Sequence, residues 1–217
     1  MKLLRLDIRD MTEQDVRLVR ERFPERWKRA SRLAKREDRF ELIAAGALLY
    51  YALGADESEI RTDAHGRPFI SDGPYFSLSH SGGRCVLALS VMRIGVDTEK
   101  LDGSNLIAAE ASLTAEELEW IKPEPLERFH LLWTRKESIF KAVGGFDDPK
   151  RIPALEGRAP YGFSIGSTIA EGFALSVCSE EKIGSLQPTK ITRKTNISIG
   201  GKNGTFPALK DGIRNVR

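Results

Sequence analysis

The sequence predicts an α+β fold in which helices are followed by antiparallel strand hairpins, and in which this arrangement occurs twice. Residues 39–54 and 128–144 have the period of amphipathic helices, and each segment ends in a glycine. Paired strand-like segments follow in both cases, residues 76–78 with 88–90 and residues 163–165 with 174–176. The helices begin alike 89 residues apart, and the strand pairs match at 86 or 87 residues. Matching elements in the same order at nearly one offset indicate a duplicated fold.

The two halves are expected to divide near residue 100. A chain of 217 residues is long enough for one large domain or two small fused ones. Residues 101–105 form a polar, turn-rich link, so we assign 1–100 to an N-terminal half and 101–217 to a C-terminal half. Within the second half, residues 114–117 read as a capping box that opens a short helix before Pro123. The class is therefore α+β with mostly antiparallel strands.

Composition is ordinary for a soluble globular protein, with 41% hydrophobic and 30% charged residues. No apolar run approaches the roughly 20 residues that span a bilayer, and the first residues lack the apolar core of a signal peptide. Cys85 and Cys178 lie in apolar strand-like runs without metal-site spacing, so we expect buried free thiols. A cytoplasmic protein without a membrane partner is predicted.

Positive charge is concentrated towards the two ends of the chain, although the net charge is only +3. Residues 17–39 carry ten Lys or Arg against four acids, and residues 182–217 carry eight against Asp211 alone. Such ends indicate an anionic partner or, alternatively, a solvated helix face and a frayed tail. We prefer the second interpretation for the tail. For the N-terminal stretch we predict anion binding, because Arg26 and Arg29 form a compact pair at i, i+3.

Acidic side chains from a strand and a helix are predicted to converge. Asp97 and Glu99 share one face of a β-branched segment at residues 94–100. Glu137 and Lys141 share a helix face with Trp133. Three carboxylates beside a lysine suit a hard divalent cation that holds a phosphate-bearing substrate. The alternative is an exposed i, i+4 ion pair, but the tryptophan on this face argues against a solvent-facing stripe.

The segment at residues 76–83 reads as an alternating strand that breaks into a glycine turn. Its backbone N–H groups, with Ser79 and His80 nearby, are able to cradle a phosphate. By itself, however, the pattern favours a plain hairpin turn with an exposed histidine. Ser79 and His80 are adjacent on a strand and point to opposite faces, which argues against a hydrolase dyad. Arg67, in a turn before a strand, is a weaker candidate.

Taken together, four motifs resemble the 4′-phosphopantetheinyl transferase superfamily, in its long, monomeric, surfactin-synthetase-activating (Sfp) type. They are Gly-Arg-Pro at 66–68, Phe-Ser-Leu-Ser-His-Ser-Gly at 76–82, Gly-Val-Asp-Thr-Glu at 95–99, and Trp-Thr-x-Lys-Glu-Ser-x-x-Lys at 133–141. The resemblance covers about residues 24 to 180 and implies a pseudo-twofold fold of two similar halves. Residues beyond about 180 match nothing in the family, and either an added strand or disorder is open for them.

The resemblance also implies an activity: transfer of the 4′-phosphopantetheine group from coenzyme A to a serine of an acyl or peptidyl carrier protein. This is the holo-acyl-carrier-protein synthase reaction, which releases 3′,5′-ADP. Asp97, Glu99 and Glu137 match the carboxylates that bind Mg2+. Glu137 also matches the candidate base for the serine, and Lys141 the lysine that meets the pyrophosphate and aids the leaving group.

The nucleotide contacts follow from the same resemblance. Ser79 and His80 match residues that contact the nucleotide, and His80 is associated with the 3′-phosphate. The cofactor-binding set implied in this way is Arg26, Arg29, Arg67, Ser79, His80 and Lys141. The acceptor is expected to be an acidic helical carrier domain attracted by the basic N-terminal half.

Two other functions remain open from the residues. A metal-dependent phosphohydrolase of coenzyme A or a related nucleotide would use the same carboxylates, with water as the acceptor. A nucleic-acid-binding module would use the basic ends. The aromatic residues, 8% of the chain, are not interleaved with the basic run as a stacking platform requires, so no nucleic-acid partner is expected.

Overall fold

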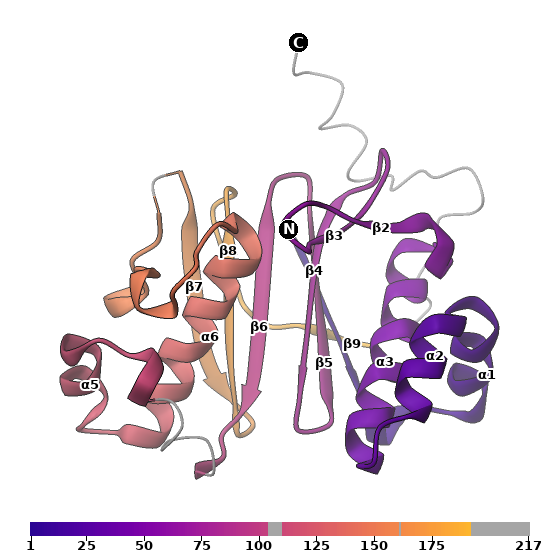
Figure 1. The fold of residues 1–217 in the computed structure, drawn as a ribbon, viewed down its shortest axis with the longest axis horizontal. Coiled ribbons are helices and arrows are strands. Elements are labelled where there is room, and N and C mark those ends of the chain that lie inside the picture. The colour runs from indigo at the N-terminus through magenta and orange to yellow at the C-terminus, as the bar shows by residue number, and fades with distance from the viewer. Residues whose placement is uncertain (104–109, 161, 192–217) are drawn as a thin grey trace. The chain divides into compact units, whose positions relative to one another are not determined.

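The computed structural model describes residues 1–103, 110–160 and 162–191, which form two compact units. Among the described residues, unit 1 holds Met1–Val91 and residues 187–191, and unit 2 lies within Met92–Leu186 (Figure 1). The segment expected to close the N-terminal half, residues 94–100, therefore belongs to unit 2, because it pairs and packs with elements of that unit. A functional division of the chain near residue 100 stays a prediction.

Unit 1 contains a four-stranded sheet in the order β4-β5-β1-β9. Its strands are β1 (Lys2–Asp7), β4 (Tyr75–Ser81), β5 (Arg84–Ser90) and β9 (Thr189–Lys190). β5 pairs antiparallel with both β4 and β1, and β9 pairs parallel with β1. Gly82 and Gly83 join β4 to β5 with φ of 55° and 78°, values that favour glycine. Part of the chain beyond residue 180 therefore adds an edge strand.

Helices cover this sheet in two layers (Figure 1). The long helix α3 (Arg36–Leu53) packs against β1, β4 and β5, while α1 (Glu13–Arg22) and α2 (Pro24–Ser31) pack on α3. α1 begins at a capping box between Thr12 and Asp15. α3 ends at Gly54 in the left-handed conformation, which confirms the predicted glycine cap.

Smaller elements complete unit 1. A two-stranded sheet pairs β2 (Ile60–Thr62) with β3 (Pro68–Ile70) in antiparallel fashion. Short 3-10 helices lie at η1 (Ile8–Asp10) and η2 (Glu57–Glu59). The predicted strand at residues 76–78 is part of β4, and the one at 88–90 is part of β5.

Unit 2 is built around an antiparallel three-stranded sheet in the order β6-β8-β7. The strands are β6 (Ile94–Lys100), β7 (Ser164–Ala170) and β8 (Phe173–Ser179). The long helix α6 (Pro125–Val143) packs against all three strands, and α5 (Ala115–Ile121) packs on α6. Thr114 and Glu117 form the predicted capping box of α5. Short 3-10 helices occur at η4 (Glu110–Ser112), η5 (Pro149–Arg151) and η6 (Leu155–Gly157).

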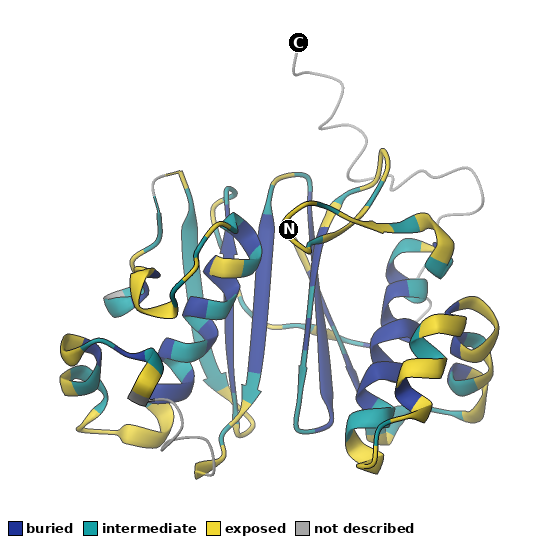
Figure 2. Ribbon diagram, in the orientation of Figure 1, coloured by how far each residue is buried: buried dark blue, intermediate teal, exposed yellow. Residues whose placement is uncertain are grey.

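Each unit has a hydrophobic core between its long helix and its sheet (Figure 2). In unit 1 the core centres on Leu48 of α3 and Leu87 of β5, and in unit 2 on Leu132 and Ile139 of α6. The predicted class, α+β with mostly antiparallel strands, is confirmed. No helix among the described residues is both long enough and apolar enough to cross a bilayer.

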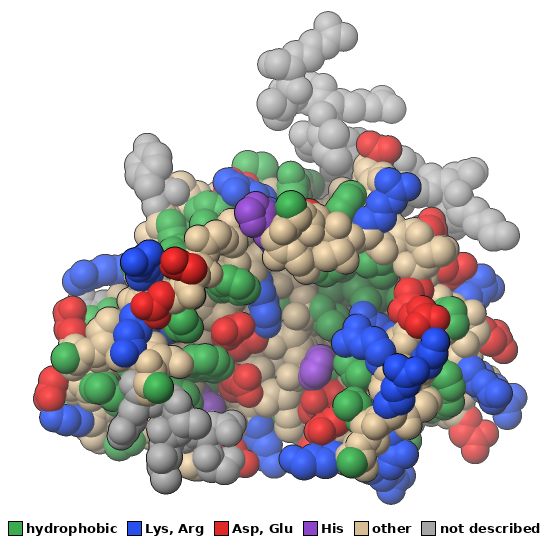
Figure 3. Space-filling model, in the orientation of Figure 1, with side chains coloured by type: hydrophobic (Ala, Val, Ile, Leu, Met, Phe, Trp, Pro, Cys, Tyr) green, Lys and Arg blue, Asp and Glu red, His purple; other side chains and the backbone are tan. Residues whose placement is uncertain are grey.

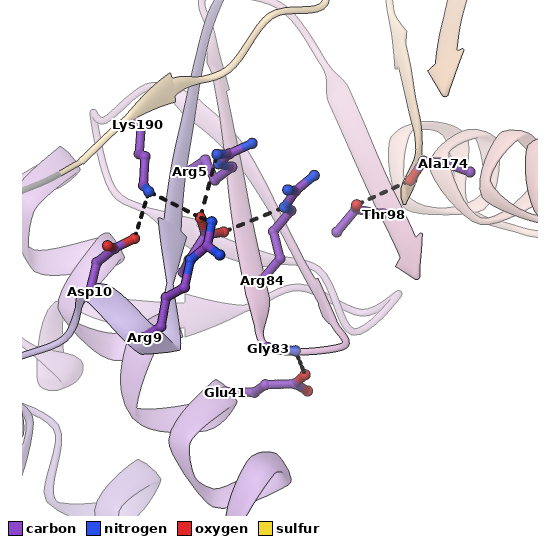
Figure 4. A network of polar contacts seen from close by, with 10 residues as sticks. Arg5, Arg9, Asp10, Glu41, Gly83, Arg84, Thr98, Ala174 and Lys190 are labelled. Atoms are coloured by element: carbon purple, nitrogen blue, oxygen red, sulfur yellow. Dashed lines mark hydrogen bonds and ion pairs between the residues drawn. The ribbon is translucent and has the colours of Figure 1, made fainter. Parts of the chain in front are cut away.

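The segment that returns to unit 1 is held by an ionic network around one buried carboxylate (Figure 4). Four basic side chains contact the buried carboxylate of Asp7: Arg5, Arg9, Arg84 and Lys190. Lys190 also lies 2.9 Å from Asp10, and the Ile191 N–H donates to the carbonyl of Arg5 at 2.7 Å. Backbone pairing and ionic contacts together fasten β9 to β1.

Candidate active site

The acidic site predicted in unit 2 depends on an unusually close contact between α6 and β6. A Cβ atom on Gly95 would lie 2.0 Å from the carbonyl oxygen of Ser138 and 2.6 Å from the amide nitrogen of Ala142. Only a glycine therefore permits this approach of helix backbone to strand. The contact brings Lys141 to Asp97, whose Oδ1 lies 2.6 Å from the lysine Nζ.

Glu137 belongs to the same cluster, one turn before Lys141 on α6. Burial and the nearby charge of Asp97 raise the pKa of the half-buried Glu137, and Lys141 opposes this in part. Two carboxylates that share one ammonium group leave an excess of negative charge in a partly desolvated place. A carboxylate with a raised pKa is a stronger base, and a neighbouring cation would relieve the repulsion.

Glu99 is the predicted carboxylate that the structure does not group with Asp97 and Glu137. It lies two residues beyond the buried Asp97 on β6 and is half-buried. In the part of the chain that the structure describes, no three His, Cys, Asp or Glu side chains are grouped closely enough to hold a metal ion. The structure thus joins Asp97, Glu137 and Lys141 without assembling the complete set of three predicted carboxylates.

Lys136 belongs to the same sequence motif, but its side chain has a different role. Its Nζ lies 2.7 Å from Glu117 of α5, donates to the carbonyl of Pro149 at 2.8 Å and is almost fully buried. Adjacent helix residues point about 100° apart, so Lys136 cannot join Glu137 at the acidic cluster. It fastens α5 and the η5 segment to α6. Glu117 also accepts the Thr114 N–H in the capping box. The sequence pattern predicted that capping box but not the ion pair between Glu117 and Lys136.

The nucleotide-binding candidates on β4 lie in unit 1. His80 Nδ1 is 2.9 Å from Oε2 of Glu41 on α3. The Gly83 N–H donates to Oε1 of the same carboxylate at 2.6 Å, a bond that Figure 4 shows. The Gly83 N–H is thus bound to Glu41, which agrees with the plain hairpin turn that the pattern favours and not with the alternative, a phosphate cradle, at this group. Burial alone would raise the pKa of Glu41, but the bonds from His80 and Gly83 lower it. Ser79, the neighbour of His80, is buried.

Sequence reasoning missed Glu41, although one signal was present. Glu41 begins the apolar stretch of α3 that continues through Leu42 and Ile43, and it is itself buried. A charged residue in such a run needs a partner, because an unpaired buried charge is very costly. The partner, His80, lies 39 residues away in sequence, and nothing local reveals it.

Basic side chains gather over α1 and α2 of unit 1 (Figure 3). Arg29 is exposed, whereas Arg26 is half-buried, and its Nε is buried without a hydrogen-bond partner. Burial and then the charge of Arg29 lower the pKa of Arg26. Arg26 also lowers the pKa of Cys85, which burial and Glu41 raise, and Cys85 is the cross-strand partner of His80. Arg26 therefore acts electrostatically on the region around His80.

Arg67 is held by a local contact. Its Nε lies 2.8 Å from Oδ2 of Asp63, and its N–H donates to Oδ1, in the turn that joins β2 to β3. Cys85 and Cys178 are free and buried, as predicted, and burial raises the pKa of Cys178 to about 12. Neither thiol is poised for reaction.

Comparisons with known proteins converge on one family. A sequence model of the 4′-phosphopantetheinyl transferase superfamily matches residues 93–156, which include β6, α5 and α6. The chain is 33% identical over 100 residues to the 4′-phosphopantetheinyl transferase psf-1 of Bacillus pumilus, covering 43% of each protein. It is 30% identical over 133 residues to Sfp of Bacillus subtilis, covering 56% of this chain and 59% of Sfp.

A relative from another genus is matched over more of its length. The 4′-phosphopantetheinyl transferase AcpT of Salmonella typhi is 33% identical over 137 residues, which cover 59% of this chain and 70% of AcpT. The match spans about half the length of psf-1 and of Sfp. Together with the acidic cluster on β6 and α6, these matches show that the chain belongs to the 4′-phosphopantetheinyl transferase superfamily.

Proposed function

We propose that the protein transfers the 4′-phosphopantetheine group of coenzyme A to a serine of a carrier protein and releases 3′,5′-ADP. One observation carries the proposal: Glu137, with a raised pKa, lies beside the Asp97–Lys141 pair. This cluster falls within the stretch matched by the superfamily model. The names of the relatives give the same activity for those proteins.

The chemistry proposed for the chain's own residues is proton transfer and charge neutralisation. Glu137 accepts the proton of the attacking serine hydroxyl, a task for which a base with a raised pKa is suited at neutral pH. Lys141 meets the pyrophosphate and neutralises charge on the leaving 3′,5′-ADP. Its bond to Asp97 holds the ammonium group one turn from Glu137, where both groups act on one substrate.

A divalent cation fits the chemistry of this cluster. Carboxylate oxygens are the ligands that Mg2+ prefers, and Asp97 and Glu137 are close enough for one charge to raise the pKa of the other. We propose these two residues, with Glu99, as the Mg2+ ligands. Bound there, the ion would polarise the pyrophosphate of coenzyme A and neutralise its charge.

Recognition of the 3′-phosphate and nucleotide of coenzyme A is assigned to residues of unit 1. His80, Arg26 and Arg29 are proposed to hold the 3′-phosphate, supported by the exposed guanidinium of Arg29 and the influence of Arg26 on the strand beside His80. Ser79 and Arg67 are proposed as further nucleotide contacts. Phosphate bound by charged donors makes stronger hydrogen bonds than neutral donors provide.

The partner and the setting follow from the same proposal. We propose an acidic helical carrier domain as the acceptor, because the basic residues over α1 and α2 would attract it. The protein is proposed to act as a monomer in the cytoplasm, where the two free buried cysteines would stay reduced.

We further propose that the two units are diverged copies of one ancestral fold. Each unit has a strand, helices that end in a long helix, and a later hairpin in the same order, with the small β2–β3 sheet inserted before the hairpin in unit 1. In each, the first strand pairs antiparallel with the second strand of the hairpin: β1 with β5 in unit 1, β6 with β8 in unit 2. The counterpart of Glu137 on α3 is Leu48, 89 residues earlier, so only one copy carries the acidic cluster.

The deciding experiment incubates the protein with coenzyme A, Mg2+ and a panel of apo carrier domains. A gain in carrier mass equal to phosphopantetheine, with release of 3′,5′-ADP, supports transfer. Release of 3′,5′-ADP in the absence of any carrier would instead identify a phosphohydrolase. No mass gain on any carrier of the panel would refute the proposal.

Coenzyme A recognition is tested separately by comparing coenzyme A with dephospho-coenzyme A, which lacks the 3′-phosphate. His80→Ala and Arg29→Ala should weaken coenzyme A by roughly 1.5–3 kcal/mol more than dephospho-coenzyme A, the cost of a lost charge-assisted bond. Lys141→Ala should affect both alike, because its target pyrophosphate is present in each. An equal loss with both substrates for His80→Ala would overturn the 3′-phosphate assignment.

A further inference from the structure

A buried carboxylate with two different donors links the long helix of unit 1 to its strand hairpin. The Glu41 side chain is 8% exposed, and its two oxygens accept hydrogen bonds from His80 Nδ1 and from the Gly83 N–H. The His80 side chain is 34% exposed, so the ring lies at the boundary between the core and solvent. One charged residue therefore restrains both the hairpin turn and the imidazole.

The chemistry of this contact determines what the other edge of the ring offers. The bonds from His80 and Gly83 lower the pKa of Glu41, so its carboxylate is ionised and only accepts hydrogen bonds. His80 must then carry its proton on Nδ1. With the proton on Nδ1, Nε2 is an acceptor in the neutral ring and a charged donor in the imidazolium form, so only the imidazolium form donates to a phosphate.

We infer that Glu41 is a positioning residue for coenzyme A: it holds the His80 ring so that Nε2, on the edge opposite the carboxylate, donates to the 3′-phosphate. This inference rests on the proposed transferase function. It adds a residue outside the predicted set and gives it a defined action, which is to fix the orientation of the His80 ring. Arg26 and Arg29 supply the net positive charge that a phosphate attracts, because the carboxylate of Glu41 would offset a charge on His80.

The alternative is a purely structural role, in which Glu41 only stabilises the β4–β5 hairpin through its bond with the Gly83 N–H. The two roles differ in what they do to substrate discrimination. Loss of a structural contact in the hairpin would weaken the binding of coenzyme A and dephospho-coenzyme A alike. Loss of His80 positioning would weaken only the binding of coenzyme A, which carries the 3′-phosphate. Glu41→Gln keeps the size of the side chain and an oxygen for Gly83, but removes the charge and the second acceptor.

The experiment measures KM and kcat for coenzyme A and dephospho-coenzyme A. Glu41→Gln should raise the KM for coenzyme A by about tenfold more than that for dephospho-coenzyme A, because a bond to a charged group is lost indirectly. Glu41→Asp, which keeps the charge on a shorter side chain, should restore part of the discrimination. Glu37→Gln, one turn earlier on α3, removes the same charge without touching the His80 bond and should leave the KM ratio unchanged.

Two further readouts separate positioning from fold. In the His80→Ala background, Glu41→Gln should add no further loss of discrimination, because the two residues act as one unit. In 15N NMR spectra, His80 should carry its proton on Nδ1 in the wild type and lose that preference in Glu41→Gln. Equal KM increases for both nucleotides would overturn the inference and leave Glu41 as a hairpin anchor. A wild type that binds coenzyme A but modifies no carrier would instead refute the transferase proposal.

Discussion

Replacing Gly95 with alanine tests how closely α6 must lie against β6. An added Cβ would meet the Ser138 carbonyl oxygen at 2.0 Å, whereas real contacts of this kind essentially never fall below 3.0 Å. Backbone atoms must therefore separate by about 1 Å, which is an overpacking change that typically costs about 1–3 kcal/mol. For a protein of this size, Tm should fall by about 2–12 °C.

The same shift should impair catalysis beyond its effect on folding. Glu137 and Lys141 both lie on α6, and Asp97 lies on β6, so a separation of the two elements moves the proposed base and cation away from their partner. A misplacement of about 1 Å can cost about a hundredfold in rate, and a loss of that size is expected in carrier modification.

Thermal unfolding and transfer rates measured well below Tm give both quantities. Gly184→Ala in the same unit is the matched control, because nothing lies within 4 Å of a Cβ there and its φ is ordinary. Gly184→Ala should be neutral in both assays. A Gly95→Ala protein with unchanged Tm and unchanged transfer would refute the reasoning that this glycine sets the helix–strand contact.

Three other substitutions test the acidic cluster and its support. Glu137→Gln should lower transfer at least about a hundredfold. It should also raise Tm near pH 7 but not at about pH 4, because a carboxylate whose folded pKa is raised costs stability only while ionised. Asp97→Ala should raise the Mg2+ concentration needed for half activity, since a hard oxygen ligand is lost; an unaltered Mg2+ titration would limit Asp97 to its bond with Lys141. Lys136→Met should cost about 3–5 kcal/mol in urea unfolding by leaving Glu117 buried and unpaired, and adding Glu117→Leu should recover much of that loss. A double variant as unstable as the single one would contradict this account.

Local signals in the sequence were sufficient for the two long helices, for α5 and for the β4–β5 hairpin, but they did not predict β1, α1 or α2. Helix periodicity with a terminal glycine predicted α3 and α6, and alternation with a glycine pair predicted the β4–β5 hairpin. The capping box predicted the start of α5. Each of these patterns involves residues that are close together in the chain. The interaction that forms the element is therefore visible in a short stretch of sequence.

Pairings between distant residues were beyond the same reasoning. Glu41 meets His80 across 39 residues, and Asp97 meets Lys141 across 44. Asp97 and Lys141 were both predicted site residues. Their direct bond, however, depends on the short distance between α6 and β6 at Gly95, and hydrophobic periodicity does not predict that distance. Strand β6 was assigned to the wrong compact unit for a similar reason: its partner, β8, begins 73 residues after Lys100.

The edge strand β9 has a consequence for how the polypeptide matures as it leaves the ribosome. Residues 92–186 interrupt unit 1, so β1 leaves the ribosome well before its parallel neighbour β9 has been translated. Until Thr189 and Lys190 appear, that side of β1 carries unpaired backbone groups able to recruit another nascent chain. The ion pair between Asp7 and Lys190 also forms only after Lys190 has been synthesised. Vectorial synthesis thus leaves the first-made sheet unfinished until all of the inserted unit has been made, an interval in which chaperone binding would protect the exposed edge.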